Sequence, residues 1–199
     1  MSAVAPRARR PKTPRAPGRL LVISGPSGVG KTAVAQRLLD DARFGRAVTA
    51  TTRLPRKGER QGRDYVFLDR EEFLKRDGEG WFLERAEVYG NLYGTPREHV
   101  SKVVDSGRHC VLVIDVQGAA TLRERGADAV FVFLLPPSLD ELLRRLVSRG
   151  GDPPQSFSTR LDAAESEMAQ ADLFSHRIVN VEVDRTAREI AGVLGLELP

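Results

Sequence analysis

Short apolar runs alternate along the chain with segments that carry helix signals. Each apolar run is continuous, which is typical of a strand buried on both faces of a parallel sheet. We expect such strands at 20–23, 111–115, 130–135 and 178–179. Helices are expected at 32–41, 95–106, 118–125, 138–149, 158–171 and 185–194. The alternation predicts an α/β fold, with a parallel sheet flanked by helices in three layers.

The segment 46–94 departs from this alternation. It mixes short β-like runs, such as Tyr65–Phe67, with many turn residues. Asp69 followed by Glu72 is a capping-box pattern, which predicts a short helix at 70–77. We therefore expect 46–94 to form an inserted, mostly β lobe outside the parallel sheet.

Cap signals mark the starts of two further helices. Thr95 is followed by Pro96 and has a Glu three positions on, so we expect the Thr95 hydroxyl to cap the next helix. Ser138 and Glu141 show the same spacing at the start of another helix. The residues at 150–154, Gly-Gly-Asp-Pro-Pro, break that helix and predict a loop.

A glycine-rich turn joins the first strand to the first helix. Its sequence matches the phosphate-binding pattern G-x-x-x-x-G-K-[ST] in full. Glycines let the backbone N–H groups turn toward an anion, and the following helix adds the partial positive charge of its N-terminus. Lys31 would reach the β- and γ-phosphates of ATP, and the Thr32 hydroxyl would bind Mg²⁺. The loop consists of Gly25, Pro26, Ser27, Gly28, Val29, Gly30, Lys31 and Thr32.

Asp115 stands at the end of the second apolar run. An acid at this place in P-loop proteins often holds Mg²⁺, usually through water. The same side chain also suits a cap for the turn formed by residues 116–118. We favour the Mg²⁺ interpretation and keep the cap as the alternative.

The excess of basic over acidic residues lies at the N-terminus. The net charge is +4, but residues 1–18 hold five basic and no acidic side chains, so the remainder carries a net −1. This Pro-, Ala- and Arg-rich segment predicts a disordered basic tail before a domain at 19–199. We interpret the tail as a solubilising extension and expect no specific nucleic-acid partner. Weak contact with RNA or anionic surfaces is the alternative.

The apolar content indicates neither a membrane span nor a secretory signal. Apolar runs fall short of the roughly 18 residues that cross a bilayer, and the N-terminus lacks the apolar stretch of a signal peptide. We therefore expect a cytoplasmic protein with no membrane partner. The single cysteine, Cys110, lies inside an apolar run, which favours a buried structural thiol over a catalytic one. Oligomeric state does not follow from these patterns.

A second group of polar residues indicates a site for another phosphate. Arg53 and Arg56 lie on either side of Pro55, and Tyr65 follows. The planar fork of arginine binds phosphate oxygens in pairs, so the two side chains can converge on one phosphate. The Tyr65 phenol can donate a further hydrogen bond. Taken alone, an arginine pair is equally compatible with a solvated surface.

Three stretches resemble the GMP-binding lobe of the guanylate kinase family. They are Thr51–Glu59 (TTRLPRKGE), Asp64–Phe67 (DYVF) and Phe82–Thr95. The similarity runs from about residue 20 to the C-terminus, with the phosphate loop in the expected place. The resemblance implies phosphoryl transfer from MgATP to GMP, with both nucleotides as small-molecule partners.

The resemblance also implies roles for individual residues. Glu84 would recognise guanine, because a carboxylate accepts hydrogen bonds from N1–H and the 2-amino group, donors that adenine lacks. Such a site would reject AMP by a factor on the order of 10⁴. The remaining substrate residues would be Thr49, Arg53, Arg56, Tyr65, Tyr93, Thr95 and Asp115.

Arginines in the last third of the chain resemble the lid of the same family, at about 150–159. Arg145 and Arg149 are four residues apart and share one helix face, and Arg160 follows the loop. These side chains would close over ATP, although an exposed arginine-bearing helix is the alternative. The residues expected to stabilise charge on the transferring phosphoryl group are Lys31, Arg56, Arg149 and Arg160.

Three positions depart from the family pattern. Val113 stands where an acid is common, and Leu92 replaces a frequent Tyr. Val181 follows Asn180 where Asp is usual, which weakens the placement of Asn180 beside the adenine. These departures bear on Mg²⁺ geometry and rate more than on the reaction.

Two other functions are compatible with parts of the pattern. One is a kinase of the same fold that acts on another phosphorylated acceptor, such as a ribose phosphate. Glu84 argues against it, since such an acceptor has no guanine to recognise. The other is a non-catalytic guanylate-kinase-like binding module. The intact phosphate loop argues against that one.

Overall fold

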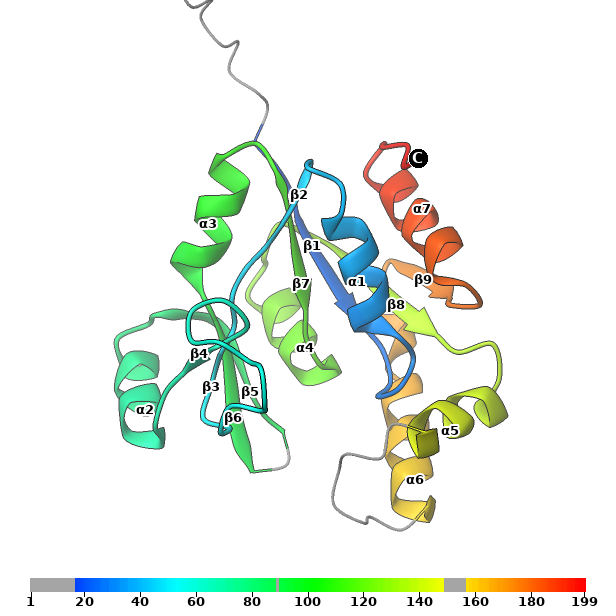
Figure 1. Cartoon of the computed structure of the whole chain (residues 1–199), viewed down its shortest axis with the longest axis horizontal. Coiled ribbons are helices and arrows are strands. Elements are labelled where there is room, and N and C mark those ends of the chain that lie inside the picture. The colour runs from blue at the N-terminus through cyan, green and yellow to red at the C-terminus, as the bar shows by residue number, and fades with distance from the viewer. Residues whose placement is uncertain (1–16, 89, 149–156) are drawn as a thin grey trace, which may run out of the picture.

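The main sheet has five parallel strands and forms the centre of the molecule (Figure 1). The computed structural model describes residues 17–88, 90–148 and 157–199. In spatial order the strands are β2 (Phe44–Arg46), β7 (His109–Val113), β1 (Leu20–Ser24), β8 (Ala129–Leu135) and β9 (His176–Val179). The carboxyl ends of parallel strands meet at one edge, where the loops after β1 and β7 lie side by side.

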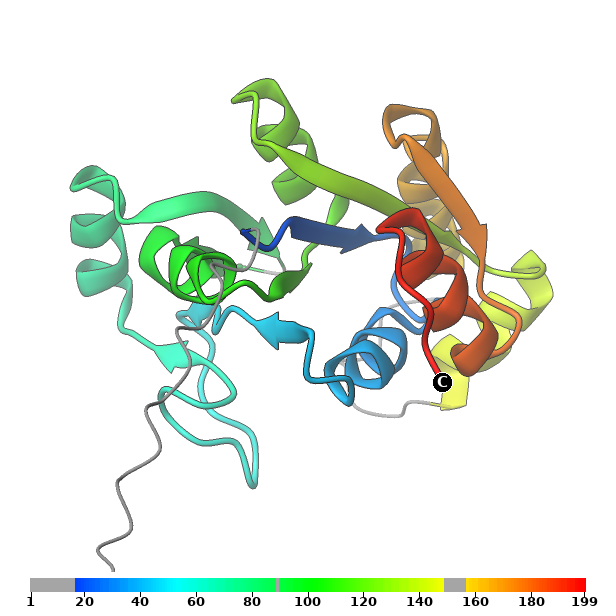
Figure 2. The ribbon, with the colours of Figure 1, turned by 90° about the horizontal axis from the view of Figure 1, so that it is seen from above.

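Helices cover both faces of this sheet, which confirms the expected three-layer α/β fold. The helices α1 (Lys31–Leu39) and α7 (Val183–Val193) pack on one face, and α3 (Arg97–Asp105) and α4 (Val116–Glu124) on the other. Figure 2 shows α1 and α7 on the side opposite to α4. Along β1 the side chains alternate between the two cores, since Leu21 and Ile23 face one and Leu20 and Val22 the other.

A second, four-stranded sheet lies to one side of the first (Figure 1). Its order is β4 (Val66–Phe67), β3 (Ala50–Thr51), β6 (Asn91–Pro96) and β5 (Phe82–Val88), and α2 (Arg70–Gly78) packs against it. Phe73 of α2 stacks on Phe82 with 4.3 Å between ring centroids. Leu92 is 2% exposed in this small core, which accounts for an apolar residue at that position.

The helices after β8 are α5 (Leu139–Ser148) and α6 (Phe157–Met168), followed by the short 3-10 helix η1 (Ala171–Leu173). The expected loop at 150–154 lies outside the described residues, as does Arg149. Arg160 lies on the backbone of α6, but its side chain is also outside the description. None of the described helices has the length and hydropathy needed to cross a bilayer.

Two of the three expected helix caps are confirmed. The Asp69 carboxylate accepts from Glu72 N–H at 2.7 Å, and the Ser138 hydroxyl accepts from Glu141 N–H at 3.2 Å. The expected Thr95 cap is wrong, because α3 begins after Pro96 without a side-chain cap. The Thr95 hydroxyl donates instead to a carboxylate on the neighbouring strand, as described below.

The only cysteine is buried under α3 and α4, as its apolar surroundings predict. Cys110 lies on β7 and is 0% exposed. Burial raises the pKa of its thiol to about 11. The thiol therefore stays protonated near neutral pH and is a structural group.

Candidate functional site

A cavity of about 310 Å³ lies where the carboxyl end of the main sheet meets the second sheet. Residues from both sheets line it, including Lys31 and Thr32 at the start of α1 and Asp115 after β7. From the second sheet and the turns beside it come Thr49, Tyr65, Glu84 and Tyr93. The cavity therefore brings three residues of the phosphate loop, Ser27, Lys31 and Thr32, together with five of the eight expected substrate residues. Arg53, Arg56 and Thr95 are not among the residues that line it.

The glycine-rich loop has the backbone that an anion cradle needs. Gly25, Gly28 and Gly30 have φ values of 139°, 83° and 104°, a region that other residues rarely adopt. A Cβ on Gly25 would lie 2.4 Å from the Leu134 carbonyl oxygen. Lys31 Nζ donates to the carbonyl oxygens of Gly25 at 2.6 Å and Pro26 at 3.1 Å, which holds the ammonium group at the mouth of the loop.

Asn180 holds this loop through two buried hydrogen bonds. Its Nδ2 donates to the Val29 carbonyl oxygen at 2.8 Å, and its Oδ1 accepts from the Thr186 hydroxyl at 2.9 Å. The residue is 2% exposed, and a Cβ on Gly30 would come within 2.5 Å of Nδ2. Asn180 therefore holds the loop in shape, and its expected place beside the adenine stays a prediction.

We predict that Asn180→Ala weakens ATP binding through the loop. The substitution leaves the Thr186 hydroxyl without its partner and the Val29 carbonyl with only the longer bond from Arg145, which should cost about 1–3 kcal/mol of unfolding free energy. The KM for ATP should rise about tenfold or more, since small displacements of positioning groups have large effects. Steady-state kinetics with each substrate varied would check this. An equal rise in the KM for GMP would contradict a role confined to the loop.

Asp115 caps α4. Its Oδ1 accepts from the Gly118 N–H at 2.7 Å, so the capping alternative is present in the structure. The residue also lines the cavity together with Thr32. A single carboxylate can serve both purposes, because it has about four lone-pair sites and the cap uses one of them. The Mg²⁺ role thus stays a prediction.

Glu84 is a buried carboxylate in the wall of the cavity. It is 2% exposed, and its Oε1 accepts from the Thr95 hydroxyl at 2.5 Å. The pKa of Glu84 is raised to about 7, mainly because the side chain is buried. The hydrogen bond from Thr95 lowers the pKa, and the negative charge of Asp115 raises it further. Keeping this carboxylate ionised in the cavity wall therefore lowers the stability of the fold.

This raised pKa predicts how Glu84 affects stability with pH. The folded state binds the Glu84 proton more tightly than the unfolded state, whose pKa lies near 4.5. The contribution of Glu84 to the free energy of unfolding is therefore largest below pH 4.5 and is lost as the pH rises through about 7. Urea unfolding should show that the free energy of unfolding of Glu84→Gln, relative to that of the wild type, increases by up to about 3 kcal/mol between pH 4.5 and pH 8. A constant difference across that range would contradict the assignment.

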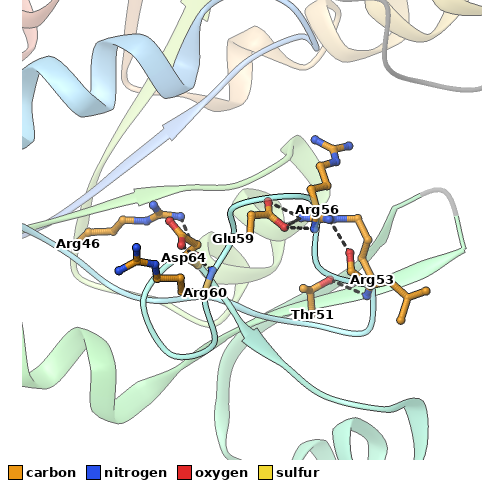
Figure 3. Close-up of polar contacts among 8 residues, drawn as sticks. Arg46, Thr51, Arg53, Arg56, Glu59, Arg60 and Asp64 are labelled. Atoms are coloured by element: carbon orange, nitrogen blue, oxygen red, sulfur yellow. Dashed lines mark hydrogen bonds and ion pairs between the residues drawn. The ribbon is translucent and has the colours of Figure 1, made fainter.

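Arg53 and Arg56 do not converge in this structure (Figure 3). The Arg53 guanidinium donates to both oxygens of Glu59, at 2.9 and 3.1 Å, while the exposed Arg56 side chain points away from it. Burial would lower the pKa of Arg53, but the hydrogen bonds with Glu59 and Tyr93 raise it. Both bonds come from the same nitrogen, Nη2, and they hold the Arg53 guanidinium beside an oxyanion group.

The two expected tyrosines are neighbours. The ring centroids of Tyr65 and Tyr93 are 6.3 Å apart, and the Arg53 guanidinium lies 5.4 Å from the Tyr65 centroid. Arg46, at the end of β2, also lines the cavity and lies 6.0 Å from the same centroid. No sequence pattern marks Arg46, because it is a lone arginine at the end of a short strand.

Two side chains from α5 and α6 reach the phosphate loop. Arg145 donates to the Val29 carbonyl oxygen at 3.3 Å and pairs with Glu141 at 2.8 Å. Glu167, which no sequence pattern marks, accepts from the Ser27 N–H at 3.0 Å and lines the cavity. The structure therefore places Arg145 at the loop, its role over ATP stays a prediction, and the Arg149 and Arg160 side chains lie outside the description.

Fold and site together define a P-loop α/β nucleotide-binding protein with a second sheet beside its phosphate loop. The family model described as "Guanylate kinase" matches residues 17–196. The chain belongs to the guanylate kinase family.

Relatives and solved structures agree with this assignment. A guanylate kinase from Clostridium perfringens (strain SM101 / Type A) is 45% identical over 180 residues, which cover 89% of this chain and 82% of the relative. A guanylate kinase from Streptomyces coelicolor is 46% identical over 189 residues, which cover 94% of this chain and 96% of the relative. The crystal structure of guanylate kinase from Anaplasma phagocytophilum superposes with a TM-score of 0.75 at 38% identity. The superposition covers 91% of this chain and 86% of that one.

Proposed function

We propose that this chain transfers the γ-phosphoryl group of MgATP to GMP and releases ADP and GDP. The observation that carries the proposal is the buried Glu84 carboxylate in the same cavity as Lys31 and Thr32. The loop residues suit a nucleoside triphosphate, and the carboxylate suits a base with two adjacent N–H donors. Guanine has that pair of donors, and adenine does not.

ATP would be bound by the backbone N–H groups of the loop, with Lys31 on its β- and γ-phosphates. Thr32 and Asp115 would hold Mg²⁺, and both offer the oxygen ligands that this hard cation prefers. The ion, when bound, neutralises charge on the phosphates. Arg145, with Arg149 and Arg160, would cover the nucleotide and stabilise charge that develops during transfer.

The GMP phosphate would lie between Arg53, Arg56, Tyr65 and Tyr93. Arg53 is already held beside the tyrosines by Glu59, so it needs little rearrangement to exchange a carboxylate for a phosphate. Thr95 would orient the Glu84 carboxylate, and Thr49 offers a hydroxyl in the same cavity. The substrates assign the reaction to purine nucleotide metabolism, and we propose the cytoplasm as its location because both nucleotides are used there.

A parallel assay with four acceptors tests this function. ADP formation from MgATP would be measured with GMP, AMP, CMP and UMP, and without an acceptor. We expect turnover with GMP to exceed that with AMP by a factor on the order of 10⁴. Turnover with none of the four, in a protein that still binds ATP, would contradict the proposal and favour a different acceptor or a binding module.

A further inference from the structure

Gly118 lies in the first turn of α4 and is buried. A glycine inside a helix is less favourable than alanine, because it loses more backbone freedom on folding and adds no packing. Gly118 is not among the glycines with positive φ, so its backbone does not require glycine. The reason for a glycine here must therefore lie in the space around its Cα.

The Glu84 carboxylate occupies that space. A Cβ on Gly118 would lie 2.8 Å from Glu84 Oε2 and 3.5 Å from Glu84 Cδ. The other carboxylate oxygen, Oε1, accepts from Thr95 at 2.5 Å. The carboxylate is thus held between the Thr95 hydroxyl on one side and the bare Cα of Gly118 on the other.

We propose that Gly118 is a specificity-determining position, because its missing side chain lets Glu84 lie where it recognises guanine. This inference rests on the proposed role of Glu84. Gly118 does not touch the substrate in this account. It acts through the carboxylate, which needs both oxygens available to the two donors on the edge of the base.

A methyl group at this position should displace the carboxylate and leave the helix in place. The Gly118 N–H is bound to Asp115 Oδ1 at 2.7 Å, and Val116, Ala119 and Leu122 anchor α4 in the core. The Glu84 carboxylate, by contrast, is the end of a side chain with rotatable bonds. The nearest other atom, Ile114 Cδ1, is at an ordinary contact distance of 3.5 Å. Recognition should therefore change and stability should not.

The test is Gly118→Ala, compared with Gly192→Ala as a matched control. Gly192 also lies inside a helix, α7, but a Cβ there has nothing within 4 Å. For Gly118→Ala we expect the KM for GMP to rise about tenfold or more, as misplacement of a recognition group should cause. The KM for ATP should stay within about twofold, since the loop is untouched. Gly192→Ala should leave both KM values unchanged.

A double-mutant cycle with Glu84→Ala separates this inference from the function on which it rests. If Gly118 acts through Glu84, Gly118→Ala should change the KM for GMP by less than about twofold in the Glu84→Ala background. A normal KM in Gly118→Ala, with a raised KM in Glu84→Ala, would overturn the inference alone. A normal KM in both would overturn base recognition by Glu84 as well. A melting temperature lowered by more than about 5 °C in Gly118→Ala would also overturn the inference, because α4 and not the Glu84 side chain would then have been displaced.

Discussion

Lys31→Ala will remove almost all phosphoryl transfer and leave the fold intact. The Lys31 ammonium group is held at the mouth of the phosphate loop by the Gly25 and Pro26 carbonyls. Charge stabilisation by a prepositioned cation is a large term in phosphoryl transfer, so kcat should fall by a factor on the order of 10³ or more. Coupled measurement of ADP formation at saturating GMP would give this value.

Lys102→Ala provides the control for Lys31→Ala. Lys102 is an exposed residue of α3 that pairs with Glu98 at 2.6 Å. Exposed ion pairs of this kind contribute little, so activity and melting temperature should match the wild type. A Lys31→Ala protein that kept full activity would contradict the mechanism proposed here.

Glu84→Gln will remove most of the preference for GMP. A glutamine amide keeps one acceptor oxygen and replaces the other with an NH₂ group, so one hydrogen bond to guanine is lost and the NH₂ group faces an N–H donor of the base. We expect kcat/KM for GMP to fall by a factor on the order of 10³, with little change for AMP. In the wild type the KM for GMP should also rise as the pH falls below about 7, because protonation of Glu84 removes the acceptor that guanine needs.

Glu87→Gln on the same strand is the matched control. Glu87 also lies on β5, but its side chain is half exposed and lies 4.0 Å from Arg70. The KM for GMP and its pH dependence should be unchanged in this variant. A Glu84→Gln enzyme with normal discrimination between GMP and AMP would contradict base recognition by Glu84.

Features encoded over a few neighbouring residues were predictable from the sequence. The phosphate loop is one, because its glycines, lysine and hydroxyl follow one another and the flanking strand and helix are continuous. The Asp69 cap is another, since donor and acceptor are three residues apart. In both cases the interacting groups lie within one or two turns of chain, so spacing alone determines their contact.

Features that depend on distant partners were not predictable in this way. The Thr95 cap failed because its hydroxyl donates to Glu84, which only the pairing of β5 with β6 brings near. Asn180 and Val29 are 151 residues apart, and the bond that holds the phosphate loop joins them. Glu167 reaches the same loop from 140 residues away. Such contacts follow from the packing of whole elements, which single-residue patterns do not carry.

The fate of the transferred group tests the central claim most directly. ATP labelled in its γ-phosphate would be incubated with GMP, Mg²⁺ and the enzyme, and the labelled product would be identified. The account predicts that the label appears in GDP, because Lys31 and Glu84 place the two nucleotides in one cavity. Label found in inorganic phosphate, with GMP unchanged, would contradict it.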